Sequence, residues 1–256
     1  MIPPSTRLQR IMTLLRNNGE IRIGTLIQEF NITPMTAWRD LQCLAEQGLL
    51  RRVRGGARLP GNAMGEPNFE TKTSSAGLAK SRIAFAALRE FVREGDIIAM
   101  EGGTTVAALI DQLPERRISV VTNSLPIALQ IRAVRPALPV RVIGGWLSSV
   151  SGNTTGPDAL KEAKHMKISV FFMSATGWNQ ACGPMDPNPL EIEIKRAFAA
   201  SAARVVLLMD SSKFQITSTS VMIHPRRIHA LITDAPLPEG VSKILRKEGV
   251  RIIVAE

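Results

Sequence analysis

Two glycines and two threonines stand together in the segment Glu101-Gly102-Gly103-Thr104-Thr105, directly after an apolar stretch of the chain. Glycine lets the backbone come close to an anion, and amide N–H groups at the start of a helix attract phosphate. The threonine hydroxyls add further hydrogen-bond donors. The pattern indicates a phosphate-binding loop. Taken alone, it also fits an ordinary strand-to-helix turn with Thr104 as the helix N-cap.

Similar polar or glycine-rich segments follow four later apolar stretches. They are Thr122-Asn123-Ser124, Gly144-Gly145, Ser174-Ala175-Thr176-Gly177 and Asp210-Ser211-Ser212-Lys213. Because ligands of parallel α/β sheets bind beyond the carboxyl ends of the strands, these segments predict one shared crevice. Lys213 would bring a positive charge to a phosphate or a sugar oxygen. A solvated surface lysine is the alternative interpretation.

The first 59 residues indicate a second chemistry, the binding of polyanions. They contain nine arginines, no lysine and four acidic residues, so they hold +5 of the chain's net charge of +10. The planar guanidinium group fits phosphates and guanine edges. Tyrosine is absent and aromatic residues make up only 4% of the chain, which disfavours the stacking platforms that bind single strands or RNA. A solvated basic surface is the alternative.

Three short helices would position these arginines. An apolar pattern with helical spacing predicts a first helix that Gly19 ends, and a second helix over about 23–30. Thr33-Pro34 is typical of an N-cap followed by proline at the first position of a third helix, which Gly48 ends.

Residues 49–58 then predict a β-hairpin with a Gly55-Gly56 turn. Helix, tight turn, helix and hairpin in this order form a winged helix-turn-helix, whose second paired helix enters the major groove while the wing meets phosphates. We therefore expect DNA contacts from Thr33, Met35, Thr36, Trp38 and Arg39 at the start of that helix, and from Arg51, Arg52 and Arg54 on the wing. For Trp38, contact with a thymine methyl and packing inside the protein both stay open.

From residue 77 onward, apolar strands alternate with helices. The predicted strands are 97–100, 118–122, 140–143, 170–174, 205–209, 230–233 and 252–255, and the clearest helices are 78–94, 105–113, 125–133 and 189–203. This alternation predicts an α/β domain with a mostly parallel sheet covered by helices on both faces. The polar segment 60–76 predicts a linker, so we expect a winged helix-turn-helix domain over 1–59 and a sensor domain over 77–256.

The composition fits a globular protein of 256 residues, with 45% hydrophobic and 21% charged residues. The chain shows no apolar run of membrane-spanning length and no secretory signal at its start. Its two cysteines, Cys43 and Cys182, are far apart and fit no metal spacing. These features predict a cytoplasmic protein without a membrane partner, a structural disulfide or a metal site.

The front segment resembles a known family. The residues Ile32-Thr33-Pro34-Met35-Thr36-Ala37-Trp38-Arg39-Asp40-Leu41, followed by Leu44, Gly48, Leu50, Arg52 and Gly55-Gly56-Ala57, are similar to the signature of the DeoR-type regulators. That family usually has isoleucine, arginine and histidine where this chain has Ala37, Trp38 and Arg54. The resemblance implies docking in the major groove of an operator, and the departures leave the operator sequence open. A winged helix that binds another protein is the alternative.

The rest of the chain resembles the sensor domain of the same family. The matching residues are 80–84, Gly95-Asp96, Gly103-Thr104-Thr105, Thr122-Asn123, Gly144-Gly145, Gly156, Gly177, Glu191, Lys195 and 210–214. Glu101 stands where the family usually has aspartate. The resemblance implies a fold similar to ribose-5-phosphate isomerase and a site for a phosphorylated sugar or a related metabolite. We expect this effector site to include Glu101, Gly102, Gly103, Thr104, Thr105, Thr122, Asn123, Gly144, Gly145, Gly177, Glu191 and Lys213.

The main alternative function is a sugar-phosphate isomerase with an appended DNA-binding domain. Isomerisation needs a positioned base, and the similar isomerases carry two acids after the fourth strand. Residues 174–178 contain no carboxylate there. Glu191 and Glu193 are candidates near the crevice, although Glu193 and Lys195 equally fit a solvated helix face, and the sequence does not place Asp186. We therefore expect no catalytic residues.

Together these features predict a DNA-binding transcription regulator, most simply a repressor of carbohydrate genes, that leaves its operator when it binds a phosphorylated metabolite. No cofactor is expected besides this effector. Because the half-sites of such operators are related by two-fold symmetry, we expect a homo-oligomer, a dimer or a tetramer.

Overall fold

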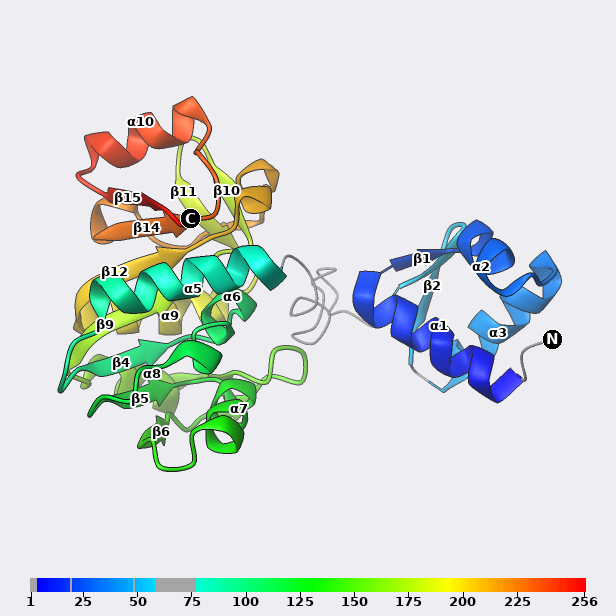
Figure 1. The fold of residues 1–256 in the computed structure, drawn as a ribbon, viewed down its shortest axis with the longest axis horizontal. Coiled ribbons are helices and arrows are strands. Elements are labelled where there is room, and N and C mark those ends of the chain that lie inside the picture. The colour runs from blue at the N-terminus through cyan, green and yellow to red at the C-terminus, as the bar shows by residue number, and fades with distance from the viewer. Residues whose placement is uncertain (1–3, 19, 48, 59–76) are drawn as a thin grey trace. The chain divides into compact units, whose positions relative to one another are not determined.

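The computed structural model describes residues 4–18, 20–47, 49–58 and 77–256 (Figure 1). The chain divides into two compact units, Met1–Ser75 and Ala76–Glu256, and each is described below by itself. The predicted linker 60–76, Gly19 and Gly48 lie outside the described residues.

The first unit contains three helices, α1 (Pro4–Asn18), α2 (Ile23–Phe30) and α3 (Pro34–Glu46). The predicted helices are confirmed, because their apolar residues meet in one core that includes Ile11, Leu26 and Leu41. Thr33 caps α3 as predicted, and its Oγ1 accepts a hydrogen bond from the Thr36 amide at 3.2 Å. The tight connection between α2 and α3 holds Asn31 in the left-handed region, with φ 47°.

The wing of the first unit differs from the predicted hairpin in two ways. The hairpin strands are β2 (Arg51–Val53) and β3 (Gly56–Arg58). A third strand, β1 (Glu20–Arg22), pairs with β3, which gives an antiparallel sheet of order β1-β3-β2. The turn is Arg54-Gly55 rather than Gly55-Gly56, with φ 83° at Gly55. Gly56 belongs to β3, where a Cβ would collide with the carbonyl of Ile21 on β1. The turn prediction was wrong because β1, too short to show a pattern, needs this glycine inside the strand.

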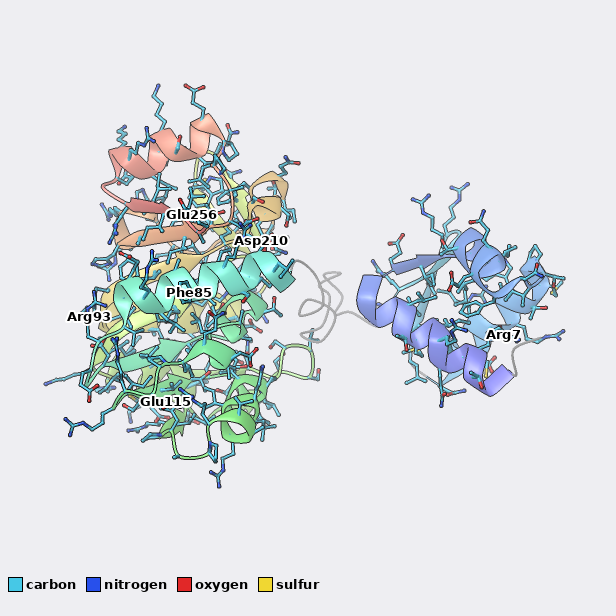
Figure 2. The ribbon with its side chains drawn as sticks, viewed as in Figure 1. Arg7, Phe85, Arg93, Glu115, Asp210 and Glu256 are labelled. Carbon is cyan, nitrogen blue, oxygen red and sulfur yellow. The ribbon has the colours of Figure 1, made fainter. Side chains whose placement is uncertain are left out.

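A buried ion pair joins the first and third helices. Arg7 of α1 lies inside the first unit (Figure 2), and its Nε and Nη2 donate to the two carboxylate oxygens of Asp40 on α3, at 2.6 and 2.9 Å. The side chains are 8% and 9% exposed. The hydrogen bond to Asp40 raises the pKa of Arg7 despite the burial. This bidentate pair therefore fixes α3 against α1.

The second unit is built on seven parallel strands, β4 (Ile97–Met100), β5 (Ser119–Thr122), β6 (Val140–Val142), β9 (Ile168–Met173), β12 (Ala202–Leu208), β14 (Ala230–Thr233) and β15 (Arg251–Val254). Their order in the sheet is β15-β14-β12-β9-β4-β5-β6, and every pairing between them is parallel. The predicted parallel sheet is confirmed. Its central strands β4, β9 and β12 are mostly apolar, as expected when both faces of a sheet are covered.

Helices lie on both faces of this sheet (Figure 1). The core on one face joins the strands to α8 (Pro157–Lys164), α9 (Pro189–Ser201) and α10 (Glu239–Lys247). On the other face lie α5 (Gly77–Phe91), the 3-10 turn η1 (Ile110–Gln112) and α7 (Leu125–Val134), which contact one another in series. The predicted helix 105–113 was wrong in form, since it splits into the single turn α6 (Thr104–Ala107) and η1.

Short antiparallel strands extend the unit beyond the carboxyl ends of the main strands. One sheet contains β10 (Gly177–Asn179), β11 (Gly183–Asp186) and β13 (Ser220–Val221), and another pairs β7 (Trp146–Leu147) with β8 (Thr154–Thr155). The 3-10 turns η2 (Ser211–Gln215) and η3 (Pro225–Arg227) lie in the same region of the sequence. The sequence did not predict these strands. Among the described residues, no helix is long and apolar enough to cross a membrane.

Candidate functional site

From β4, the strands β5 and β6 extend the sheet towards one side, and β9, β12, β14 and β15 extend it towards the other. The order of the strands therefore reverses between the neighbours β4 and β9. Open α/β sheets bind ligands at such a topological switch point, beyond the carboxyl ends of the strands. Glu101 follows β4 and Ser174 follows β9. Glu101 Oε1 accepts hydrogen bonds from the Ser174 amide at 2.8 Å and from Ser174 Oγ at 2.7 Å. The predicted residue Glu101 therefore stands at the switch point, 2% exposed.

Lys195 of α9 is the positive centre of this region. Its Nζ lies 2.8 Å from Asp186 Oδ2, 3.2 Å from Glu101 Oε2 and 3.2 Å from the Ser174 carbonyl. Burial alone would lower the pKa of Lys195, but Asp186, Glu101 and Glu191 together outweigh it and hold that pKa above its usual value. The acids around Lys195 therefore favour its charged form. The sequence left a solvated helix face open for both Glu193 and Lys195. In the structure the helix turns Lys195 towards these acids, whereas Glu193 is exposed.

Glu191, predicted near the crevice, lies in the same buried cluster. Its carboxylate accepts hydrogen bonds from Asn153 Nδ2 at 3.2 Å and from Asn188 Nδ2 at 3.3 Å. Burial raises the pKa of Glu191, against the attraction of Lys195. We call Glu101, Ser174, Asp186, Glu191, Lys195 and Asn153 the switch-point cluster.

Two buried asparagine oxygens at this edge of the sheet accept no hydrogen bond from any residue that the structure describes. Asn123 Nδ2 donates to the Thr154 carbonyl at 3.1 Å, and Asn153 Nδ2 donates to Glu191. These acceptors fix the orientation of both amides, which leaves each Oδ1 on the other side. The residues are 3% and 2% exposed. Buried acceptors without a partner are uncommon in folded proteins. These two oxygens therefore indicate a hydrogen-bond donor that does not belong to the described residues.

The glycine pair is required by the protein's own side chains. A Cβ on Gly102 would collide with the amide of Asn153, and one on Gly103 would collide with Ser174 Oγ and Glu101 Oε1. The sequence interpretation assigned these glycines to the approach of an anion. The structure shows a further reason for glycine at both positions, because side chains of the switch-point cluster fill the space that a Cβ would occupy.

The remaining predicted effector residues occupy separate places along the same edge of the sheet. Thr104 and Thr105 are buried in α6, and Thr122 Oγ1 donates to the Met100 carbonyl at 2.7 Å. Gly145 lies against Thr155 and Ala159, and Gly177 against Ile216. Lys213 is half-buried on η2, and no described residue pairs with it. The structure therefore brings Glu101, Gly102, Gly103 and Glu191 together, while no contact joins Gly144, Gly145 or Lys213 to them.

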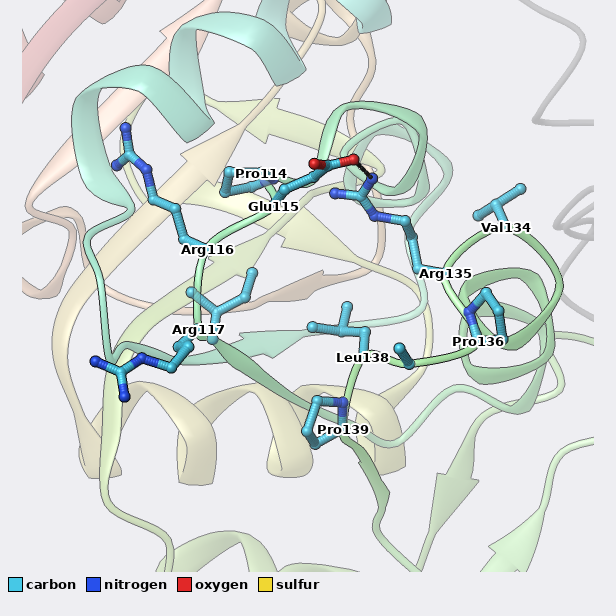
Figure 3. A pocket seen from close by; sticks show the side chains of 11 residues that line it. Pro114, Glu115, Arg116, Arg117, Val134, Arg135, Pro136, Leu138 and Pro139 are labelled. Carbon is cyan, nitrogen blue, oxygen red and sulfur yellow. Dashed lines mark ion pairs between the residues drawn. The ribbon is translucent and has the colours of Figure 1, made fainter.

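A cleft of about 740 Å³ lies at the opposite edge of the sheet from the switch-point cluster (Figure 3). Segments 114–118 and 134–139 line it, before the first residues of β5 and β6. Arg135 pairs with Glu115 at 3.7 Å. Arg116 donates to the Val92 carbonyl and Arg117 to Glu94. Because proline, valine and leucine side chains form much of the lining and the arginines are engaged, this cleft does not resemble a phosphate site.

The opening turn of α3 is the most exposed part of the predicted DNA-binding surface. Met35 is 70% exposed, and Thr33 and Arg39 are also exposed. Thr36 is half-buried, and its Oγ1 lies 2.9 Å from that of Thr33. No described residue holds the guanidinium of Arg39. The predicted recognition residues therefore share the opening end of a helix whose inward residues, such as Ala37 and Leu41, are buried.

The wing arginines fall into two classes. Arg51 lies opposite Arg58 in the β2–β3 ladder, and both are exposed. Arg52 lies opposite Ala57, and its guanidinium sits 5.0 Å from the centre of the Trp38 ring. Its Nη1 also donates to Gln42 Oε1. Trp38 itself is half-buried and packs against the helical core. The structure thus shows the packing that the sequence left open for Trp38.

Both units match family models. Residues 7–62 match the DeoR-like helix-turn-helix domain, and residues 76–235 match the DeoR C terminal sensor domain. The chain belongs to the DeoR family. Its members pair a DNA-binding head with a sensor, so the predicted regulator class is confirmed.

Whole-chain relatives agree with the DeoR assignment. An uncharacterized HTH-type transcriptional regulator of Escherichia coli (strain K12), YgbI, is 30% identical over 99% of this chain and 98% of its own length. The HTH-type transcriptional regulator IolR of Bacillus subtilis (strain 168) is 28% identical over 97% and 98%. The glycerol-3-phosphate regulon repressor of Escherichia coli (strain K12) is 28% identical over 94% and 95%.

Among solved structures, ribose 5-phosphate isomerase A from Methanocaldococcus jannaschii superposes with a TM-score of 0.40 and 18% identity, covering 55% of each chain. This DeoR-type sensor unit also contains candidates that the sequence did not place or did not name. Asp186, which the sequence named without a position, ends β11, and the unnamed Asn153 and Asn188 directly precede β8 and α9. The spacing of Glu191 and Lys195, four residues apart on one helix, was the available signal for the buried pair.

Proposed function

We propose that this DeoR-family regulator represses carbohydrate genes and leaves its operator when a phosphorylated sugar or a related metabolite binds at the switch-point cluster. The observation that carries the DNA half of the proposal is the exposed opening turn of α3, with Met35 70% exposed and Arg39 unpaired among the described residues. Relatives named as a glycerol-3-phosphate regulon repressor and a putative aga operon transcriptional repressor support the carbohydrate half.

In this proposal, the start of α3 enters the major groove, and Thr33, Met35, Thr36 and Arg39 reach base edges and the adjoining backbone. The exposed wing arginines Arg51 and Arg54 meet phosphates. Arg51 and Arg58 lie directly opposite each other in the ladder. The two like charges repel, and although Glu20 lies opposite Arg58 on its other side, a phosphate near Arg51 would relieve the repulsion further.

Replacing Arg39 with alanine tests the groove contact. A bidentate arginine contact to a base contributes about 1–3 kcal/mol, so we expect Arg39→Ala to weaken specific binding by about 5- to 150-fold. Fluorescence anisotropy with a duplex selected by the wild-type protein from a random library measures this loss. Arg246→Ala on α10 is the charge-matched control, because Arg246 is an exposed arginine of the second unit. Unchanged affinity of Arg39→Ala at several salt concentrations would contradict the proposal.

The chemistry of the switch-point cluster orients the effector. Three carboxylates, Glu101, Asp186 and Glu191, surround a single lysine, so a phosphate would be repelled from this end. Asn123 Oδ1 and Asn153 Oδ1 accept hydrogen bonds and need donors, which sugar hydroxyls supply. We therefore place the hydroxyl-bearing part of the effector at the asparagines. Its phosphate belongs near Lys213, where no described carboxylate pairs with the amine.

A thermal-shift screen with phosphorylated metabolites and their dephosphorylated counterparts tests the effector half. At about 100 times its dissociation constant, a ligand adds about 2.7 kcal/mol of stability, so we expect a rise of about 5–10 °C for the matching compound. Lys213→Ala should lose this shift and keep operator binding. Lys243→Ala, an exposed lysine on α10, should retain it. An equal shift in wild type and Lys213→Ala would remove Lys213 from the site.

We propose a sensor without catalysis. Asp186 and Glu101 are engaged with Lys195, and Glu191 is held by two asparagine amides, so each of these acids serves the cluster itself. Turnover of a pentose phosphate that is lost in Glu191→Gln would instead support the isomerase alternative. We also propose that the protein acts as a homo-oligomer, because paired heads read two-fold operators.

A further inference from the structure

Arg52 is exposed overall, but its position in the wing sheet is on the face that packs against the core. Across the three strands it lies in register with Ala57 and Ile21, which are 0% and 4% exposed. Successive residues of a strand point to opposite faces, so Arg51 and Arg58 share the other face. An arginine on the face that carries buried apolar side chains lays its aliphatic stem on the core and turns its charged end outward.

The charged end of Arg52 is anchored on α3 rather than left free. Its guanidinium carbon lies 5.0 Å from the centre of the Trp38 ring, and its Nη1 donates to Gln42 Oε1. Gln42 Nε2 donates in turn to Glu46 Oε1 at 2.8 Å. One side chain of the wing is thus connected to three side chains on successive turns of α3.

Trp38 supplies the platform for this anchor. It is half-buried and packs against the helical core, which fixes its ring. A planar guanidinium over an indole is the most favourable cation–π pairing among the aromatic side chains. Arg51, Arg54 and Arg58 have no such partner among the residues that the structure describes. Of these four wing arginines, only Arg52 has its guanidinium fixed by a described side chain.

We propose that Trp38 and Arg52 are positioning residues that lock the wing to the recognition helix, and that Arg52 does not itself bind a phosphate. This inference rests on the proposed DNA-binding function of the head. The lock sets where Arg51 and Arg54 stand relative to Thr36 and Arg39, and so which phosphates the wing meets when α3 is seated in the groove. To bind a phosphate itself, Arg52 would have to leave both Trp38 and Gln42.

The experiment compares Arg52→Met, Arg51→Met, Trp38→Leu and the double variant Trp38→Leu/Arg52→Met in the full-length protein. Binding is measured by anisotropy over a salt series, with the duplex that the wild-type protein selects from a random library. Loss of a phosphate contact lowers the slope of log affinity against log salt by about one. We expect that change for Arg51→Met, the matched control on the opposite face of the same strand.

For Arg52→Met we expect the wild-type salt slope and an affinity about five- to tenfold weaker, since the lock is worth a cation–π pair and a hydrogen bond. Trp38→Leu should weaken binding by a similar factor, and the double variant should be no weaker than either single variant. A slope reduced by about one in Arg52→Met, as for Arg51→Met, would overturn the proposal. Independent, multiplying losses in the double variant would overturn it as well.

Arg52→Lys keeps the proposal testable if Arg52→Met unfolds the head. Lysine preserves the charge and a similar stem but lacks the planar fork. We expect Arg52→Lys to lose affinity as Arg52→Met does, whereas near-wild-type affinity would show that a point charge suffices and would overturn the lock. Failure of the wild-type protein to prefer any duplex would refute the proposed function instead, so the two failures are distinguishable.

Discussion

Replacing Lys195 with methionine is expected to destabilise the sensor unit by about 3–5 kcal/mol, because it leaves buried carboxylates without their cation. Glu101 and Asp186 lie 3.2 and 2.8 Å from Lys195 Nζ, and the three side chains are at most 6% exposed. Methionine keeps an unbranched stem of nearly the same length and lacks only the amine, so the loss mainly reports the charge. Urea unfolding followed by the fluorescence of buried Trp178 measures it.

Two variants sharpen this test. Lys164→Met on α8 removes an exposed lysine, and its effect should stay within about 0.5 kcal/mol. Adding Asp186→Asn to Lys195→Met should recover part of the stability, since it removes one of the orphaned charges. A loss in Lys195→Met no larger than that in Lys164→Met would show that the buried acids do not need the lysine.

Replacing Asp40 with alanine is expected to unfold the DNA-binding head while the sensor unit stays folded. Breaking a buried ion pair costs about 3–5 kcal/mol, and domains below about 70–80 residues seldom have more stability than that. The described head ends at Arg58, and Asp40 accepts two hydrogen bonds from Arg7. Circular dichroism and operator binding should both show the loss.

Glu29→Ala is the control for Asp40→Ala. Glu29 is an exposed acid on α2, so its removal should change the head's stability little. The thermal shift caused by the effector should persist in Asp40→Ala, because the sensor is a separate compact unit. A folded head that has merely lost DNA affinity would contradict the structural role of Asp40 and make it a binding residue.

Much of the scaffold follows from local sequence. The seven main strands are mostly apolar segments, and such segments are typical of a parallel sheet whose two faces are covered by helices. The capped start of α3 follows from Thr33-Pro34 in the same direct way. Short elements such as β1 and β11 escaped prediction, because two to four residues carry no periodicity and depend on the partner strands that pair with them.

The candidate sites show where local patterns stop. Lys195 has the charge of a surface residue, and only the fold reveals that Glu101, which follows the distant strand β4, lies 3.2 Å from its amine. Arg51 and Arg52 are neighbours of the same residue type. Because successive side chains of β2 point to opposite faces, Arg52 stacks on Trp38 and Arg51 does not. In both cases the partner lies on another element of secondary structure, so composition and spacing do not identify it.

The collision that any side chain at Gly102 or Gly103 would cause has a consequence for inheritance. Asn153, Ser174 and Glu101 exclude a Cβ at these positions whether or not a metabolite is bound. Selection for a stable fold would therefore preserve both glycines even in a descendant protein that binds a different metabolite or none. The presence of both glycines in such descendants would indicate common ancestry and not a shared metabolite. The metabolite that each protein binds would have to be inferred from residues that the fold leaves free to vary.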